Sequence, residues 1–317
     1  MGQFYGVNGK NLRRQYRDYL SDFKNWEQNK HAKQWLVFPE NIGPYLSIDE
    51  TALSKGELYT IITNKQAKGK KGSIVAIFSG TRAEPIVEQL LKISSKERDK
   101  VKEITLDMAN SMKTIAKKCF PKAIQVTDRS HLQKLALEAL QDIRVKHRWD
   151  AIDLENEQIK KARLENKTFT PKEFGNGDTR KQLLARSRYL LYKAPSNWTE
   201  NQRIRSKILF DQYPDIKTAF DLAQGLRNIF NTASTIRVAY TKLAHWYKDV
   251  ENTGFRAFNT IANTIAINYR SILNYFINRS TNAAAESFNA KIKAFRAQLR
   301  GVRNIEFFLF RLTTIFA

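Results

Sequence analysis

The sequence predicts an α/β fold, with a mixed five-stranded sheet, flanking helices and an all-helical insertion. Three consecutive runs rich in β-branched and aromatic residues are separated only by short loops, which is typical of antiparallel strands. These runs lie at 44–50, 58–63 and 73–78. Two further strands, 103–107 and 123–127, alternate with helical patterns and therefore extend the sheet in parallel.

Helical periodicity accounts for most of the remaining chain. The first 35 residues indicate a basic amphipathic helix with Arg13, Arg14 and Arg17 exposed. Further helices are expected at 84–93, at 111–119 and from Leu132 onward. From about Arg144 to Phe276 strand signals stop and apolar residues recur at helical spacing. A last helix ends at Gly301, and the apolar run 304–316 follows it.

These patterns divide the chain into four segments. They are a basic N-terminal helix (1–34), a first part of the sheet domain (35–144), a helical insertion (145–265) and closing helices (266–317).

The composition indicates a polyanionic partner. Lys and Arg number 54 against 31 Asp and Glu, a formal net charge of +23. The excess is spread along the chain without a basic amphipathic anchor, which favours nucleic acid over a membrane surface. The longest uncharged stretch, 257–269, is too short to span a bilayer. One cysteine and four histidines exclude a zinc ribbon or zinc finger.

Two aspartates occupy equivalent positions on different predicted strands. In Ser47-Ile48-Asp49 and Thr105-Leu106-Asp107, alternation places each Asp on the face opposite the apolar residues. If the two strands pair in parallel, about 4.8 Å apart, the carboxylates can jointly hold a divalent cation. The neighbouring Glu50 points to the other face and is excluded from this group.

Glu286 is the best third acid, because small residues around it allow its helix to approach a sheet closely. Lys293, Arg296 and Arg300 follow it on the same helical face. An acid beside a column of cations suits a metal ion and a phosphodiester. The alternative interpretation is that the two aspartates merely end strands and that Glu286 is a solvated helix position.

Four stretches resemble a known family. They are YLSIDETALSKGELYTIIT, VKEITLDMANSMKTIAKKCFPKAIQVTDRSHLQKLALEAL, RYLLYKAPSNWTENQRIR and ILNYFINRSTNAAAESFNAKIKAFRAQLRGVRNIEFFLFRL. Together they closely resemble the DDE transposases of bacterial insertion sequences, in the ISL-three group. The resemblance implies an RNase H-like sheet domain interrupted by a helical insertion between the second Asp and the Glu.

The resemblance also implies roles for particular residues. Asp49, Asp107 and Glu286 match the family's metal-binding triad, which implies Mg²⁺ or Mn²⁺, with two ions expected. Asp128 and His131 match a secondary D-x-x-H signature in which Ser130 replaces the usual aromatic residue. Asp128 is interpreted first as a helix N-cap, and His131 as structural or DNA-contacting. Lys293 matches a basic position that often contacts terminal phosphates.

The resemblance implies cleavage of transposon ends and strand transfer into target DNA. The expected partner is double-stranded DNA, as terminal inverted repeats and as target, bound by a homo-oligomer in a synaptic complex. The chain starts close to the sheet, so end recognition is expected from a separately encoded N-terminal DNA-binding protein or from a longer reading frame. The N-terminus lacks the apolar core of a signal peptide, so we expect a cytoplasmic, nucleoid-associated protein without a membrane partner.

Two alternatives remain open from sequence. One is an RNase H-like nuclease or resolvase that cuts without joining. The other is a DNA-binding relative that has lost catalysis, which the acids at all three matching positions argue against.

Overall fold

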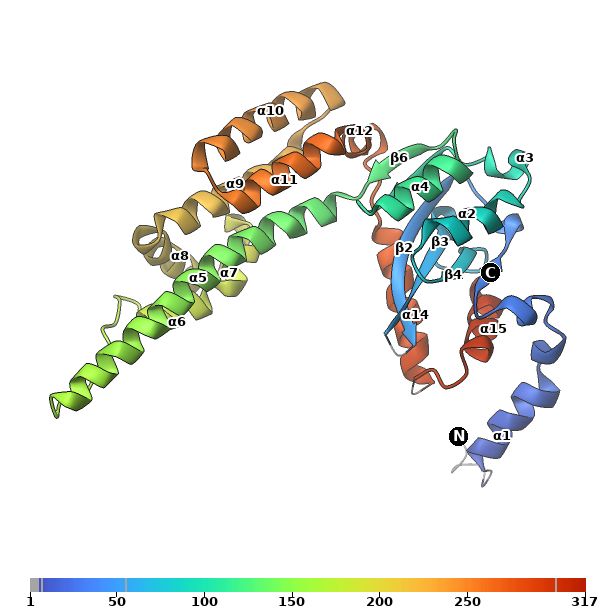
Figure 1. The fold of residues 1–317 in the computed structure, drawn as a ribbon, viewed down its shortest axis with the longest axis horizontal. Coiled ribbons are helices and arrows are strands. Elements are labelled where there is room, and N and C mark those ends of the chain that lie inside the picture. The colour runs from blue at the N-terminus through green and yellow to red at the C-terminus, as the bar shows by residue number, and fades with distance from the viewer. Residues whose placement is uncertain (1–5, 7, 55, 300) are drawn as a thin grey trace. The chain divides into compact units, whose positions relative to one another are not determined.

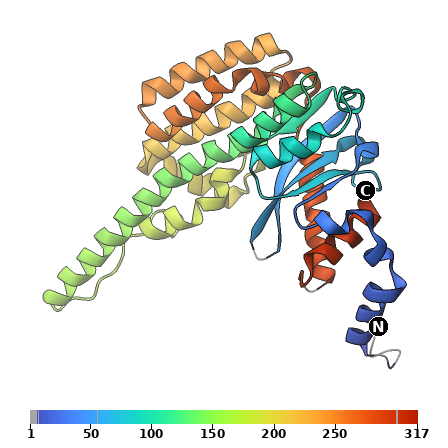
Figure 2. The same ribbon diagram turned by 45° about the vertical axis from the view of Figure 1, so that its right-hand side comes forward.

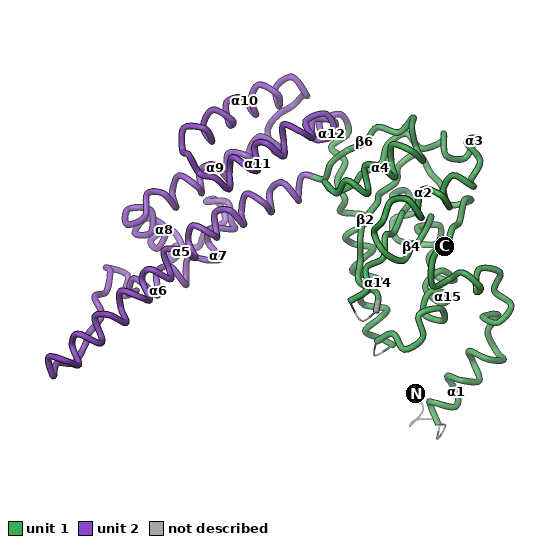
Figure 3. Tube along the Cα trace, viewed as in Figure 1, with its two compact units in different colours: residues 1–128, 278–317 green, residues 129–277 purple. Residues whose placement is uncertain are grey.

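The computed structural model describes residues 6, 8–54, 56–299 and 301–317, which form two compact units (Figure 3). Unit 1 comprises Met1–Asp128 and Asn278–Ala317, and unit 2 comprises Arg129–Ile277. The boundaries of the helical insertion predicted from sequence are 145 and 265. Both positions fall inside continuous helices, where no change in sequence pattern marks a border.

Unit 1 is built on a mixed sheet with the strand order β1-β4-β3-β2-β5-β6 (Figure 1). The strands are β1 (Trp35–Val37), β2 (Tyr45–Ser54), β3 (Glu57–Asn64), β4 (Ile74–Ser79), β5 (Glu103–Leu106) and β6 (Ile124–Thr127). β1 to β4, β4 to β3 and β3 to β2 pair antiparallel, whereas β2 to β5 and β5 to β6 pair in parallel. The α/β class and the parallel pairing of the first and fourth predicted strands are therefore confirmed.

The strand count of five is wrong, because the sheet has six strands. The additional strand, β1, contains three residues and pairs with β4, with Leu36 opposite Ile77, so β1 forms the edge of the sheet. A run of three residues is too short to show the alternation by which strands are detected in a sequence.

One face of the sheet packs against α2 (Ala83–Leu91) and α4 (Asn110–Cys119), which lie side by side on it in Figure 1. The short α3 (Ser95–Arg98) follows α2. Mostly even-numbered strand residues, with Val75 of β4, form this core with the helices. They include Leu46, Ile48, Ile62, Ile104 and Leu106.

The opposite face is covered by α14 (Ala283–Gln298) and α15 (Ile305–Phe316), which return from the C-terminal end of the chain. Their apolar residues Phe288, Ile292 and Leu309 join a second core with Ile61 and Ile77 of the sheet. This arrangement fixes α14 beside β2, which is the element that carries Asp49.

The N-terminal segment is helical only at its beginning. It contains α1 (Gly9–Gln15), a π-helical turn, η1 (Tyr16–Leu20), and the 3₁₀ turns η2 (Asp22–Asn25) and η3 (Glu27–His31). The prediction of one helix over the first 35 residues is therefore wrong beyond Leu20. The chain turns here because aromatic packing on α15 outweighs helical periodicity: Phe23 lies 5.1 Å from Phe307 and Trp26 lies 5.5 Å from Phe310, centroid to centroid.

Unit 2 is all-helical (Figure 2). Its helices are α5 (Arg129–Leu164), α6 (Arg180–Arg186), α7 (Arg188–Tyr192), α8 (Glu200–Gln212), α9 (Pro214–Thr232), α10 (Ile236–Thr253), α11 (Arg256–Ile267), α12 (Tyr269–Leu273) and α13 (Tyr275–Asn278), whose last residue belongs to unit 1. α9 contacts both α5 and α10, and Trp246 of α10 donates from Nε1 to the carbonyl of Leu222 at 2.9 Å. Within the described chain, no helix combines the length and the hydrophobicity that crossing a bilayer requires.

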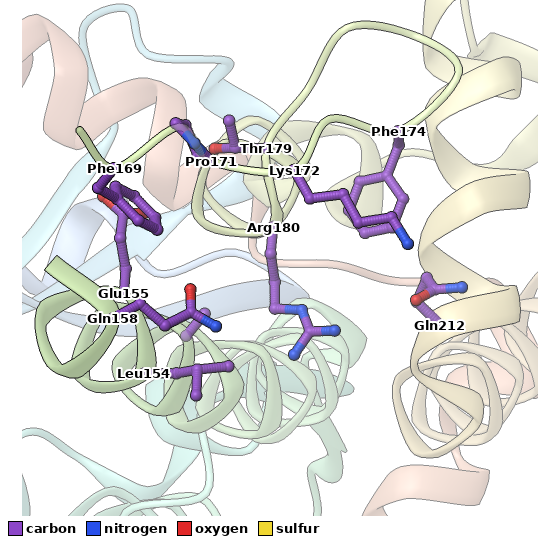
Figure 4. Close-up of a pocket in the computed structure, with 11 residues that line it drawn as sticks. Leu154, Glu155, Gln158, Phe169, Pro171, Lys172, Phe174, Thr179, Arg180 and Gln212 are labelled. Carbon is purple, nitrogen blue, oxygen red and sulfur yellow. The ribbon is translucent and has the colours of Figure 1, made fainter. Parts of the chain in front are cut away.

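The segment between α5 and α6 is held by a buried carboxylate. Asp178 is fully buried and is paired with Arg186 and with Arg205, the latter at 2.7 Å. Beside this segment lies a pocket of about 210 Å³, into which Arg180 projects between Gln158 and Gln212 (Figure 4). The carboxylate that lines the pocket, Glu155, is already paired with Lys181 at 2.5 Å. Because this carboxylate is already in an ion pair, we assign no reactive role to the pocket.

Candidate active site

The parallel ladder between β2 and β5 places Asp49 and Asp107 at the same level. Ser47 faces Thr105 in the register, and each aspartate stands two residues further along its own strand direction. Neighbouring strands are separated by about 4.8 Å. Asp49 lies on β2 and Asp107 directly follows the last residue of β5, at the carboxyl end of the parallel pairing. The prediction that both aspartates leave the apolar face agrees with the burial of Ile48 and Leu106 in the opposite core.

Asp49 is fastened to α14. Its Oδ1 accepts the backbone N–H of Glu50 at 2.9 Å, and its Oδ2 accepts Nδ2 of Asn289 at 2.7 Å. A hydrogen bond to an ionised acceptor is stronger than one between neutral groups. Asn289 therefore ties a strand residue to a helix 240 positions later in the chain.

Asp107 begins the loop that leads into α4. Its Oδ1 accepts the backbone N–H of Ala109 at 2.6 Å. Burial lowers the pKa of Lys113, which lies one turn into α4. The negative charge of Asp107 opposes part of this effect. The carboxylate is thus oriented by its own loop and faced by a cation.

Glu286 lies in the first turn of α14, with an exposed side chain. It is one helical turn before Asn289, so the two residues share the stripe of the helix that borders β2. The start of α14 is held by Asn282, which is 1% exposed and donates from Nδ2 to the carbonyl of Ile48 at 3.5 Å. Residues on both sides of Glu286 therefore anchor its helix to the strand of Asp49.

No three Asp, Glu, His or Cys side chains lie close enough together to hold a metal ion, among the residues that the structure describes. The structure has Asp49 on β2, Asp107 directly after the neighbouring strand β5 and Glu286 on the neighbouring helix α14. It does not gather the three carboxylates into one ligand group, so the triad stays a prediction.

Glu50 is a nearby acid that sequence reasoning excluded. Its pKa is raised, first by burial and then by the negative charges of Asp107 and Asp49. Alternation along β2 assigned Glu50 to the opposite face. However, β5 ends at Leu106, so Asp107 stands past the end of the ladder and is not confined to one face. The signal that could have indicated this proximity is that β2 continues beyond the end of its parallel neighbour β5.

We expect Glu50→Gln to remove part of the pH dependence of stability. The folded-state pKa of Glu50 lies above its ordinary value, so its ionisation costs more in the folded chain and stability falls as pH rises through that pKa. Glu50→Gln should match the wild type at low pH and exceed it at neutral pH by up to about 1 kcal/mol, since the group is half-exposed. Denaturant unfolding across pH 4 to about 8 measures this. An equal pH dependence in both proteins would contradict it.

Sequence reasoning also missed a buried polar cluster on the face of β5 that carries Glu103 and Thr105. Nζ of Lys65 donates to Oγ1 of Thr105 at 2.8 Å and lies 3.7 Å from Oε1 of Glu103. Oε2 of Glu103 accepts Nδ2 of Asn278 at 2.9 Å. Asn278 is the first residue of the chain returning to unit 1, so this cluster joins the segment before α14 to the strand of Asp107.

The predicted DNA-contacting residues have different surroundings. Lys293 is exposed on the Glu286 stripe of α14. Arg296 is half-buried and its Nη1 lies 3.5 Å from the carbonyl oxygen of Ala52, so part of its role is packing on β2. Arg300 lies outside the described residues. His131 is half-buried in the first turn of α5, which belongs to unit 2.

Asp128 is buried at the end of β6, directly before α5. Its backbone N–H donates to the carbonyl of Leu106 at 3.0 Å, and its charge acts on Lys65. This position is compatible with the N-cap interpretation, which remains a prediction.

A mixed sheet with helices on both faces is the arrangement expected of an RNase H-like transposase. Residues 46–312 match the family model of the DDE transposases of the ISL-three group, described as "Transposase". The chain belongs to this family.

The transposase for insertion sequence element IS1001 of Bordetella parapertussis is a curated relative. It is 22% identical to this chain over 276 residues, which cover 86% of this chain and 61% of the relative. The chain thus spans about three fifths of the length of this relative.

Proposed function

We propose that this chain cleaves the ends of an insertion sequence and joins them to target DNA, with Asp49, Asp107 and Glu286 as the acids that hold divalent cations. The observation that carries the proposal is the hydrogen bond between Asn289 and Asp49. This bond fixes the helix of the third acid to the strand of the first, beside the strand that precedes Asp107.

The side chains present fit a hard divalent cation. The donors are carboxylate oxygens, which Mg²⁺ and Mn²⁺ prefer over nitrogen or sulfur. The pKa of Glu50 is raised first by burial and then by the negative charges of Asp107 and Asp49, and a bound cation would offset the repulsion between these carboxylates. Two such ions would activate the attacking oxygen and stabilise the leaving oxygen of a phosphodiester.

The chain's own residues supply orientation and charge. Asn289 fixes the rotamer of Asp49, and the backbone N–H of Ala109 fixes that of Asp107. Lys293, on the Glu286 stripe, can neutralise a phosphate next to the reacting one. The net charge of +23 favours such phosphate contacts along the whole chain. The DNA consists of the terminal inverted repeats and a target duplex, and a homo-oligomer holds the two ends together.

The experiment must separate joining from simple cutting. Duplex oligonucleotides with the ends of the encoding element are incubated with the chain and Mg²⁺ or Mn²⁺, and cleaved and joined strands are resolved on a denaturing gel. We expect both products, and none after chelation of the metal. Cleavage of branched DNA or of an RNA–DNA hybrid without any joined product would contradict the proposal and indicate a nuclease.

A further inference from the structure

A basic hollow lies in unit 1 between α1 and the start of α15. Its volume is about 460 Å³, and Phe307 forms part of its wall. The cations that line it, here called the basic groove, are Lys10, Arg13, Arg14, Arg17 and Arg303. Arg17 is paired with Asp18 at 2.7 Å. Among the described residues, no carboxylate forms an ion pair with any of the other four.

The walls of the basic groove are held in place by aromatic packing. Tyr16 meets Phe307 edge to face at 6.3 Å, and the guanidinium of Arg311 lies 5.9 Å from the Tyr16 ring. Phe307 itself is 4% exposed. The cations therefore project from a supported helix, which lowers the entropy cost of binding a ligand.

The spacing of these cations favours an extended polyanion. Lys10 is three and four residues before Arg13 and Arg14, and Arg17 is four and three residues after them, so the cations lie along one side of the helical segment. Like charges at this spacing destabilise a helix. The sequence GKNLRRQ of α1 contains no acid that could offset this repulsion. A row of phosphates can do so at every position, whereas a single small anion cannot.

The basic groove lies at the far end of α14 from Glu286. The helix axis from Glu286 to Leu299, which also lines the groove, spans 13 residues, or about 20 Å at 1.5 Å per residue. In a duplex, 20 Å corresponds to about six base pairs. Lys293 and Arg296 occupy the stretch of α14 between these two points.

We infer that the basic groove binds the phosphate backbone of duplex DNA about six base pairs from the phosphodiester held at the acids. This inference rests on the proposed function for the identity of the DNA, but the binding it describes does not require catalysis. The groove positions the duplex and does not read its sequence, because guanidinium and ammonium contacts to phosphate carry no base information.

The test compares two variants of the full chain with equal net charge. The first, Lys10→Gln/Arg13→Gln/Arg14→Gln/Arg303→Gln, neutralises the groove. The control neutralises four lysines on and near the α2–α4 face, all exposed and without an ion pair among the described residues. The control substitutions are Lys96→Gln, Lys102→Gln, Lys117→Gln and Lys118→Gln. Circular dichroism and melting temperature establish that both variants fold.

Affinity for an end-bearing duplex of about 30 base pairs is measured by fluorescence anisotropy against salt. For the groove variant we expect at least about a tenfold loss at 0.1 M salt and a fall of about three in the salt-dependence slope, since each phosphate contact contributes about 0.9. The control should change the slope by less than about one. The duplex is then shortened one base pair at a time. Once it is too short to reach the groove, the difference in affinity between wild type and groove variant should disappear.

Equal losses in the two variants would overturn the inference, because they would show a general effect of charge. A deficit that persists on a duplex too short to reach the groove would also overturn it. Failure of the proposed function gives a different result. If the wild type binds DNA through the groove but never cuts it, this inference stands and the proposed cleavage and joining activity is contradicted.

Discussion

Replacing Asp49, Asp107 or Glu286 with its amide, Asp49→Asn, Asp107→Asn or Glu286→Gln, is expected to lower strand cleavage by at least about 1,000-fold. Such a loss corresponds to about 4 kcal/mol of transition-state stabilisation. An amide keeps the shape of the side chain but removes the charge that, in the proposed mechanism, would hold a cation. Single-turnover cleavage of a labelled transposon end measures the effect, because it isolates the chemical step from product release.

DNA binding by these variants should be unchanged or tighter, since each loses a negative charge near the phosphodiester. Asp49→Asn weakens the charge-assisted hydrogen bond from Asn289 and relieves part of the repulsion on Glu50, so the melting temperature of each variant is measured to establish that it is folded. Glu84→Gln, an exposed acid of α2, serves as the matched control and should cleave within about twofold of wild type. Any amide variant that keeps a tenth of the wild-type rate is not a member of the triad.

Asn289→Leu tests whether orientation of Asp49 matters in itself. The substitution removes the 2.7 Å hydrogen bond but leaves all three carboxylates in the chain. We expect an intermediate loss of about 10- to 100-fold in rate, with the requirement for divalent metal shifted to higher concentration. A metal dependence identical to that of wild type would assign Asn289 a purely structural role.

The sequence predicts the part of the site that depends on periodicity. Alternation along two strands is enough to place Ile48 and Leu106 in one core and Asp49 on the other face, and the structure has this arrangement. Helical spacing similarly predicts that Lys293 shares a face with Glu286. The same rule does not indicate that the charge of Asp107 acts on Glu50, because Asp107 follows the last residue of β5 and alternation does not apply to it.

Contacts between distant segments are not predictable from local pattern. In the sequence, nothing distinguishes Asn289 from other polar helix residues, although the fold brings it to Asp49. Lys65 likewise resembles an ordinary residue of a basic loop. In the structure, Lys65 begins the short turn η5 (Lys65–Ala67) and its ammonium reaches β5. The packing of Trp26 on Phe310 likewise depends on α15, nearly 300 residues away, and it overrides the helical periodicity of the N-terminus.

Lys65→Met is expected to destabilise unit 1 by about 3 kcal/mol or more. The side chains of Lys65 and Glu103 are 15% and 3% exposed, so the substitution leaves a buried carboxylate without its cation. The pair itself has poor geometry, because Oε1 of Glu103 accepts no hydrogen bond from the described residues. The double variant Lys65→Met/Glu103→Met should therefore recover most of the loss, since replacing a whole buried pair is often neutral.

Hydrogen exchange of peptides from β2 and β5 measures this prediction locally, which avoids the mixed unfolding of a two-unit chain. The sign of the pH dependence provides a second check. Burial lowers the Lys65 pKa despite the opposing effect of Glu103, so the folded chain releases this proton at lower pH than the unfolded chain does. Between the two pKa values the unfolded state binds more protons, and wild-type stability rises with pH. Lys65→Met should lack this contribution. A double variant no more stable than the single one would show that the cluster is held by the ion pair and not by the surrounding packing.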